Sequence, residues 1–252
     1  MHVRVLAFDL DDTLAITKSP ISATMANLLG QALKSYELCV ISGGSFPQIR
    51  DQVIAQLDVP PEQLARLHIM PTSGTRYYRF EIDRNEWIKQ YAEDLSDAEK
   101  ATIIEVLTTS AKQLGYWEAS PYGDIVEDRG SQITFSALGQ KAPPEVKYPW
   151  DPDRKKREHW RQIASELLPD LAVGIGGTTS LDVTRKGIDK AYGMRKLFDI
   201  LQIRADQVVF FGDQLQQGGN DYPVIETGVT AIAVRDSTDT AVALAAIAAV
   251  TG

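Results

Sequence analysis

The sequence predicts an α/β protein whose core is a doubly wound parallel sheet, with a second, α+β domain inserted into that core. Two observations predict this fold. Short apolar stretches alternate with helical patterns near both ends of the chain, while the middle of the chain contains a polar–apolar alternation typical of an antiparallel strand. We therefore expect the core in residues 1–82 and 184–252, and the inserted domain in residues 83–183.

The first core segment begins with an apolar run at residues 3–8 that stops abruptly at carboxylates, as a buried parallel strand does. Apolar residues at helical spacing over 25–36 predict a helix, and residues 38–41 predict a second strand. Ser45 followed by Gln48 is typical of a capping box. It predicts a helix that includes Val53, Ile54 and Leu57 on its apolar face.

The second core segment repeats this alternation. Its predicted elements are a helix around residues 197–201, strands at 208–211 and 230–234, and a helix at 239–250. In the inserted domain, residues 131–138 predict an antiparallel strand with one face in water. Residues 96–114 and 151–168 predict helices, and the proline-bearing segment 141–147 predicts a loop between them.

The composition excludes several classes of function. A net charge of -8 argues against general affinity for nucleic acid or for an anionic membrane. Cys39 is the single cysteine, so no internal disulfide forms, and its apolar neighbours predict a buried thiol. The start of the chain lacks the pattern of a secretory signal, and the longest apolar run, residues 241–250, is too short to span a membrane. We expect a cytoplasmic protein.

Three acids follow the first predicted strand within four positions, at Asp9, Asp11 and Asp12. Carboxylates this close repel one another unless a cation offsets their charge, and Mg²⁺ prefers such hard oxygen ligands. An Asp-rich turn that caps a helix is the structural alternative. Asp213 follows another predicted strand, with Asp221 close behind it.

Parallel strands end at a common edge of a sheet, so we expect these acids to share one crevice. The predicted Mg²⁺ ligands are Asp9, Asp11, Asp213 and Asp221. Ser42 and Gly43 follow a third strand and are candidates for phosphate binding, although two glycines after a strand are a weak signal. Lys190 begins a predicted helix and is a candidate for the same phosphate, or else a lysine on a solvated face. The three scattered histidines and the single cysteine argue against a zinc enzyme.

Four motifs follow one another along the chain. They are Asp9-x-Asp11-x-Thr13, Ser42 at a strand end, Lys190 at the start of a helix, and Gly212-Asp213 followed by Asn220-Asp221. The sequence resembles the haloacid dehalogenase superfamily, because the four motifs of that superfamily occur in the same order. The inserted region is similar in size to the α/β cap of the Cof-like sugar phosphatases. The segments 180–190 and 210–222 resemble the eukaryotic-type phosphomannomutases more than the generic phosphatases. The resemblance implies a Rossmann-like core, a cap that selects the substrate, and a possible homodimer formed through the cap.

The resemblance also implies residue roles. Asp9 is the nucleophile, Asp11 the general acid and base, and Asp213 a metal ligand together with Asp9 and the Asp11 carbonyl group. In the cap, Ser180 and Asp182 bind sugar hydroxyls and Arg129 binds phosphate. Where such mutases carry further arginines, this chain has Lys18, Gln140 and Lys147. Lysine is a point charge and glutamine carries none, so the clamp on a second phosphate is weakened.

Three functions therefore stay open. The first is a Mg²⁺-dependent phosphatase that acts on a phosphorylated sugar through an aspartyl-phosphate. The second is a phosphomannomutase or phosphohexomutase, in which the same intermediate passes its phosphoryl group to a sugar hydroxyl instead of water. The third is a non-catalytic sugar-phosphate-binding protein, against which the joint presence of Asp9, Asp11 and Asp213 argues.

Overall fold

A computed structural model describes residues 2–251 of the chain. Two compact units form it: a core, which runs up to Ala92 and again from Asp189, and a cap, Glu93–Ile188. The sequence placed these boundaries ten and five residues earlier. Strand β5 (Glu86–Ala92) pairs with β4 (Arg76–Glu81) and therefore belongs to the core, while β9 (Ser180–Arg185) pairs inside the cap and extends across the boundary expected at residue 183.

The core sheet has seven strands in the order β11-β10-β1-β2-β3-β4-β5. Its parallel strands are β1 (Val5–Phe8), β2 (Glu37–Ile41), β3 (Leu67–Met70), β10 (Val208–Gly212) and β11 (Thr230–Ala233). This confirms the predicted doubly wound α/β core. The antiparallel strands β4 and β5 extend it at one edge.

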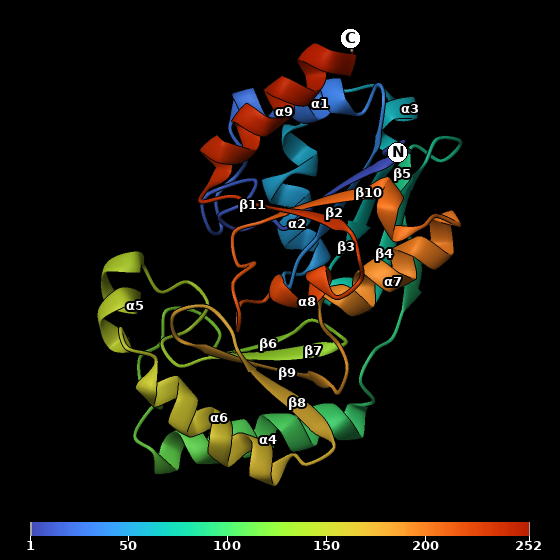
Figure 1. The fold of residues 1–252 in the computed structure, drawn as a ribbon. Coiled ribbons are helices and arrows are strands. Elements are labelled where there is room, and N and C mark those ends of the chain that lie inside the picture. The colour runs from blue at the N-terminus through green and yellow to red at the C-terminus, as the bar shows by residue number, and fades with distance from the viewer. Residues whose placement is uncertain (1, 252) are drawn as a thin grey trace. The chain divides into compact units, whose positions relative to one another are not determined.

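Helices cover both faces of this sheet (Figure 1). They are α1 (Ala23–Ala32), α2 (Phe46–Gln52), α3 (Pro61–Leu64), α7 (Lys190–Leu201), α8 (Tyr222–Ile225) and α9 (Ser237–Thr251), with single 3-10 turns at Ile54–Gln56, Thr72–Gly74 and Ala205–Gln207. Side chains of β1 alternate between the faces, as a strand requires. Leu6 and Phe8 join the apolar cluster that contains residues of α1, α2 and α9, whereas Val5 and Ala7 join the cluster that contains residues of α7 and α8.

The predicted capping box at Ser45 is wrong. Ser45 is the N-cap residue of α2, but its side chain makes no capping hydrogen bond. The Gln48 amide reaches Asp11 instead of turning back to the N-cap backbone. The helix also ends at Gln52, so Val53 lies beyond it and Ile54 begins a 3-10 turn.

The cap is built on a four-stranded antiparallel sheet in the order β6-β7-β9-β8. Its elements are β6 (Val126–Asp128), β7 (Gln132–Ser136), β8 (Leu171–Ile175), β9, α4 (Asp97–Gln113), α5 (Pro144–Trp150) and α6 (Lys155–Leu167). Phe135 and Trp160 meet edge to face with ring centroids 5.0 Å apart in its buried apolar cluster. The Ser96 hydroxyl and Glu99 form the capping box that starts α4.

Two expectations for the cap are corrected. The polar side chains of β7 do not face water: Gln132, Thr134 and Ser136 are buried, and hydrogen bonds within the cap satisfy them. The expected loop at 141–147 contains the start of α5, because Pro144 occupies the first turn of a helix, where its missing N–H costs nothing. Throughout residues 2–251, every helix is too short or too polar to cross a membrane.

Candidate active site

Asp9 lies at the carboxyl end of β1, where its backbone N–H donates to the Phe211 carbonyl oxygen of β10 at 3.0 Å. Its side chain is buried and meets the ammonium of Lys190, with 2.6 Å between Asp9 Oδ1 and Lys190 Nζ. Lys190 Nζ also contacts Asp221 Oδ1 at 2.5 Å. Lys190 is only 2% exposed, which rules out the solvated-face alternative for this lysine.

The local sequence explains how Lys190 reaches this buried position. Lys190 is the first residue of α7, and Asp189 caps that helix by accepting a hydrogen bond from the Tyr192 N–H. Gly193 lets α7 approach the sheet, because a Cβ at this position would lie 2.4 Å from Ile41 Cδ1. The N-cap residue Asp189 and the close approach allowed by Gly193 together place the Lys190 side chain at the ends of the strands.

Burial and the charge of the partner act in opposite directions on the pKa values of Asp9 and Lys190. Desolvation raises the pKa of Asp9 to about 7, an effect that Lys190 counters and Asp221 adds to. For Lys190, desolvation lowers the pKa, but the carboxylates of Asp9 and Asp221 outweigh it and the pKa is raised. The ammonium is therefore charged at neutral pH, and Asp9 is held near the point at which its carboxylate gains a proton.

Asp213 follows β10 and is tied to the segment after β1. Thr13 Oγ1 donates to Asp213 Oδ1 at 3.4 Å and accepts from the Asp213 backbone N–H at 3.1 Å. Partial burial raises the pKa of Asp213. Thr13 was recognised in the sequence only as part of a motif, and the structure gives it this contact.

Asp221 is fully buried and contacts Gln214, the residue that follows Asp213. Its Oδ2 accepts the Gln214 backbone N–H at 3.0 Å. Gly212 makes this possible, since a Cβ there would lie 2.5 Å from Asp221 Oδ2. At the end of β10, Asp213 thus supplies an acid and Gly212 leaves the space that the Asp221 carboxylate occupies.

Three of the predicted metal ligands come together. Among residues 2–251, Asp9, Asp213 and Asp221 each offer a carboxylate oxygen within 4.8 Å of the others. Lys190 is the cationic member of the cluster, so when the carboxylates are ionised these four side chains carry net negative charge. A hard divalent cation fits that oxygen set and that charge.

The Asp11 carboxylate is not part of this cluster of ligand oxygens. It turns toward α2 and the loop after β1, accepting the Lys18 backbone N–H at 2.9 Å and the Gln48 amide at 3.3 Å. Asp12 turns away to accept two hydrogen bonds from Thr17. Asp11 and Asp12, neighbours in the sequence, therefore have different surroundings.

The turn after β2 has its own hydrogen bond. Ser42 is buried, and its Oγ accepts the Gly44 backbone N–H at 3.0 Å. That bond occupies the Gly44 amide and leaves the Ser42 hydroxyl hydrogen to donate elsewhere. Ser42 and Gly43 follow the end of β2, the strand that pairs with β1, and Asp9 follows the end of β1.

The candidate residues of the cap lie on β9, in the turns at the two ends of β7, and on α5. Ser180 is paired with Ser136 at one end of β7, next to the turn that holds Gln140, and Lys147 Nζ donates to the Gln140 carbonyl oxygen at 3.4 Å. Asp182 accepts a hydrogen bond from Thr134 at 2.6 Å. Arg129 precedes the opposite end of β7 and pairs with Glu127 at 2.7 Å.

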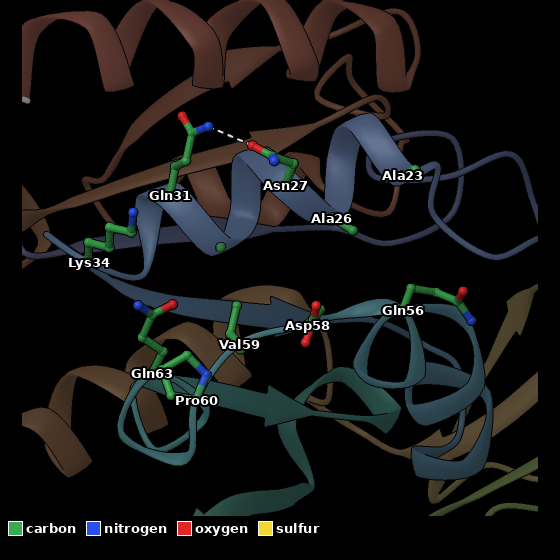
Figure 2. Close-up of a pocket in the computed structure, with 11 residues that line it drawn as sticks. Ala23, Ala26, Asn27, Gln31, Lys34, Gln56, Asp58, Val59, Pro60 and Gln63 are labelled. Carbon is green, nitrogen blue, oxygen red and sulfur yellow. Dashed lines mark hydrogen bonds between the residues drawn. The ribbon is translucent and has the colours of Figure 1, made fainter.

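A separate cleft of about 530 Å³ lies in the core, between α1 and the segment that precedes β3 (Figure 2). It is lined by Ala23, Ala26, Asn27, Gly30, Gln31, Lys34, Gln56, Asp58, Val59, Pro60 and Gln63. None of these was predicted as a site residue, and none belongs to the carboxylate cluster.

Sequence reasoning missed Gln48, Gln52 and Gln214 as parts of the site. Gln214 Nε2 donates to Asp213 Oδ2 at 2.8 Å. Gln48 and Gln52 both reach Asp11 from α2. The available signal was their spacing of four residues, which places two amides on one face of a helix that follows a strand end.

Comparison with known proteins agrees with this geometry. The profile of a family described as haloacid dehalogenase-like hydrolase matches residues 141–251. The phosphomannomutase of Oryza sativa subsp. japonica is 30% identical over 229 residues, which cover 88% of this chain and 86% of the relative. A probable phosphomannomutase of Caenorhabditis elegans is 26% identical over 226 residues, covering 87% and 85%.

Among solved structures, the IMP-bound, N-terminally truncated IMP-nucleotidase of Plasmodium falciparum aligns with a TM-score of 0.69 at 15% identity, covering 98% of this chain and 68% of that one. At this identity the likeness shows the fold alone. The chain belongs to the haloacid dehalogenase-like hydrolase family, whose members include enzymes of phosphoryl transfer. Within that family it is similar, over most of its length, to phosphomannomutases.

Proposed function

We propose that this protein is a Mg²⁺-dependent hexose-phosphate mutase that exchanges mannose 6-phosphate and mannose 1-phosphate through an aspartyl-phosphate on Asp9. Two observations together carry the proposal. The chain aligns with phosphomannomutases over more than four fifths of both lengths, and its Asp9, Lys190, Asp213 and Asp221 lie together in one cluster.

In the first half-reaction a carboxylate oxygen of Asp9 bonds to phosphorus while the bond from phosphorus to the sugar oxygen breaks. Asp11 gives its proton to that leaving oxygen. In the second half-reaction Asp11 takes the proton of a hydroxyl group of a hexose monophosphate. The oxygen of that hydroxyl attacks the aspartyl-phosphate, which frees Asp9 and gives a hexose 1,6-bisphosphate, the substrate from which the other phosphoryl group returns to Asp9. The protons and phosphoryl groups balance over the two steps.

Lys190 supports these steps by its position. Its ammonium holds one oxygen of Asp9 and stays charged beside the carboxylates, so it favours the ionised, nucleophilic form of Asp9. Asp9 and Asp213 are the residues that would hold Mg²⁺, together with the Asp11 carbonyl, and Asp221 would fix Lys190. When bound, Mg²⁺ supplies positive charge that offsets the charge of the phosphoryl oxygens.

The direct test incubates the protein with Mg²⁺, mannose 1-phosphate and a trace of hexose 1,6-bisphosphate, and follows the phosphorus NMR spectrum. The proposal expects the mannose 6-phosphate signal to grow faster than that of inorganic phosphate. Inorganic phosphate as the sole product would replace the mutase with a phosphatase. Absence of turnover on a panel of hexose 1- and 6-phosphates would leave a non-catalytic binder.

Hydrolysis is the second candidate, and Gln140 and Lys147 favour it. Both positions carry arginine in the mutases that the sequence resembles, and here the Lys147 ammonium is directed to the Gln140 carbonyl oxygen. A loosely held bisphosphate lets water compete for the aspartyl-phosphate. The double variant Gln140→Arg, Lys147→Arg should then raise the ratio of isomer exchange to phosphate release about tenfold, since each charged hydrogen bond contributes roughly 1.5–3 kcal/mol.

A further inference from the structure

Helix α2 carries two glutamines that reach the Asp11 carboxylate. Gln48 and Gln52 are four residues apart and therefore lie on the same face of the helix. Gln48 Nε2 donates to Asp11 Oδ2 at 3.3 Å, and Gln52 Nε2 lies 3.5 Å from Asp11 Oδ1. The acid that follows β1 is thus contacted by a helix that follows β2.

The turn before α2 leaves room for the first of these amides. A Cβ at Gly44 would lie 2.6 Å from Gln48 Oε1 and 2.9 Å from Gln48 Cδ. The Gln48 amide therefore occupies space that a larger residue at position 44 would take. Its oxygen lies against the turn after β2 while its nitrogen reaches Asp11, and this packing limits the rotamers open to the side chain.

Gln52 has a different main partner. Its Nε2 donates to the Ser19 carbonyl oxygen at 2.7 Å, much shorter than its 3.5 Å approach to Asp11. Gln52 is also 4% exposed, whereas Gln48 is partly exposed. Gln52 thus mainly fixes the loop that leads to α1, and Gln48 is the residue whose amide is directed to Asp11.

We propose that Gln48 is a positioning residue that orients the Asp11 carboxylate for proton transfer. The inference rests on the proposed function, in which Asp11 carries the proton. Oδ1 accepts the Lys18 backbone N–H at 2.9 Å and a longer contact from Gln52 at 3.5 Å, whereas the Gln48 amide is the donor to Oδ2 at 3.3 Å. Removal of the Gln48 amide leaves Oδ2 without this donor and lets the carboxyl group rotate away from the leaving oxygen.

The test compares two substrates with different leaving groups. A sugar alkoxide needs a proton to leave, whereas p-nitrophenolate leaves without one, so only the first reaction depends on a correctly oriented acid. We measure kcat/KM, which reports the steps up to loss of the leaving group, for a hexose 1-phosphate and for p-nitrophenyl phosphate. The proteins are wild type, Gln48→Leu and the matched control Gln56→Leu, whose Nε2 donates to the Asp51 backbone carbonyl oxygen at 3.1 Å.

Gln48→Leu should lower kcat/KM for the hexose phosphate about tenfold, less than the ~10²-fold cost of a 1 Å misplacement because the Lys18 N–H still holds Oδ1. It should lower kcat/KM for p-nitrophenyl phosphate less than about twofold. Gln56→Leu should change neither. Circular dichroism at matched temperature shows that each variant is folded. Equal losses on both substrates, or no loss on either, would overturn the inference while wild-type turnover leaves the proposed function standing. A wild type that cleaves no hexose phosphate would overturn both.

Discussion

Two sites with buried ion pairs, one in the core and one in the cap, differ in their charge balance. In the core, Lys190 meets Asp9 and Asp221 at 2.6 and 2.5 Å, and Asp213 stands close to both acids. In the cap, Arg157 meets Asp151 at 2.7 Å, with side chains 7% and 1% exposed. Both clusters are removed from water, so burial alone does not distinguish them.

The two sites differ in the hydrogen bonds of their carboxylates and in the direction in which the pKa of each carboxylate is shifted. Asp151 also accepts the backbone N–H groups of Lys156 and Arg157, and Arg157 donates further to the carbonyl oxygens of Gly177 and Asp151. Desolvation raises the pKa of Asp151, but Arg157 and these N–H groups lower it more, so the net shift is downward.

For Asp9 the balance has the opposite sign, because desolvation and Asp221 together outweigh Lys190. A buried pair whose charges and hydrogen bonds are matched serves to hold the fold. A buried cluster with excess carboxylate binds a proton or a further cation, and carboxylates with raised pKa values of this kind are typical of functional sites. The cap pair and the core cluster thus predict different responses to substitution.

The largest effect is expected at the nucleophile. Asp9→Asn removes the attacking carboxylate, so turnover of hexose phosphates should fall by about 10²–10⁴-fold, while the fold persists. Initial rates with purified protein, beside a thermal melt, check both parts. Residual turnover above about a hundredth of wild type would take Asp9 out of the role of nucleophile.

Arg157→Met tests the cap pair. It leaves Asp151 charged and buried, which should lower the free energy of unfolding by about 3–5 kcal/mol. Arg161→Met is the matched control: its pair with Glu158 is partly exposed, so its cost should stay below about 1 kcal/mol. Urea titrations followed by fluorescence give both values, and equal costs would contradict a structural role for the Arg157 pair.

Metal should stabilise the core cluster by offsetting its excess charge. Saturating Mg²⁺, at a hundred times its dissociation constant, should raise the free energy of unfolding of wild type by about 2.7 kcal/mol. Asp213→Asn should abolish most of that gain. If Mg²⁺ shifts the melting temperature of the variant as much as that of wild type, the ion binds elsewhere.

A smaller effect is expected at His68, which is buried between Glu37 and Tyr77 at 2.7 Å from each. A carboxylate only accepts, so Nε2 carries the proton and the Tyr77 hydroxyl donates to Nδ1. Burial lowers the pKa of His68 below 6.5, although Glu37 opposes this. The unfolded chain therefore takes up a proton first as the pH falls below about 6.5, and stability is lost there at up to about 1.4 kcal/mol per pH unit.

Urea titrations between pH 7 and pH 5 measure this slope. His68→Gln keeps a hydrogen-bonding side chain but cannot titrate, so the slope over this interval should be reduced in the variant. An equal slope in both proteins would assign the pH dependence to other groups.

Much of the core could be predicted from the sequence because its signals are local. Strand ends followed by acids pointed to Asp9 and Asp213, and the alternation of strands and helices predicted a doubly wound α/β core, but not its strand order or strand β3. The hairpin β4–β5 could not be recognised, since its half-exposed strands lack the long apolar runs of the parallel ones. Gln48 was taken for a capping residue because a local pattern does not reveal a long-range acceptor such as Asp11.

The cap was less predictable for a related reason. The alternation in β7 indicated a strand, but burial of its polar face depends on partners such as Asp182, which is 48 residues from Thr134. The proline pair at the start of α5 was interpreted as a loop signal, although proline is also common in the first turn of a helix. Contacts between residues this far apart in the sequence leave no local pattern, so the cap was harder to predict than the strand ends of the core.

The central claim is that the excess carboxylate of the core cluster supports covalent phosphoryl transfer on Asp9. Wild type is mixed with Mg²⁺ and a hexose 1,6-bisphosphate, quenched in acid within milliseconds, digested, and analysed by peptide mass spectrometry. The account predicts one added phosphoryl group, on Asp9, when Mg²⁺ is present. It predicts no added group when Mg²⁺ is chelated before the bisphosphate is mixed in. A phosphoryl group on another residue, or turnover with no phosphorylated peptide in a quench fast enough to trap a single turnover, would contradict it.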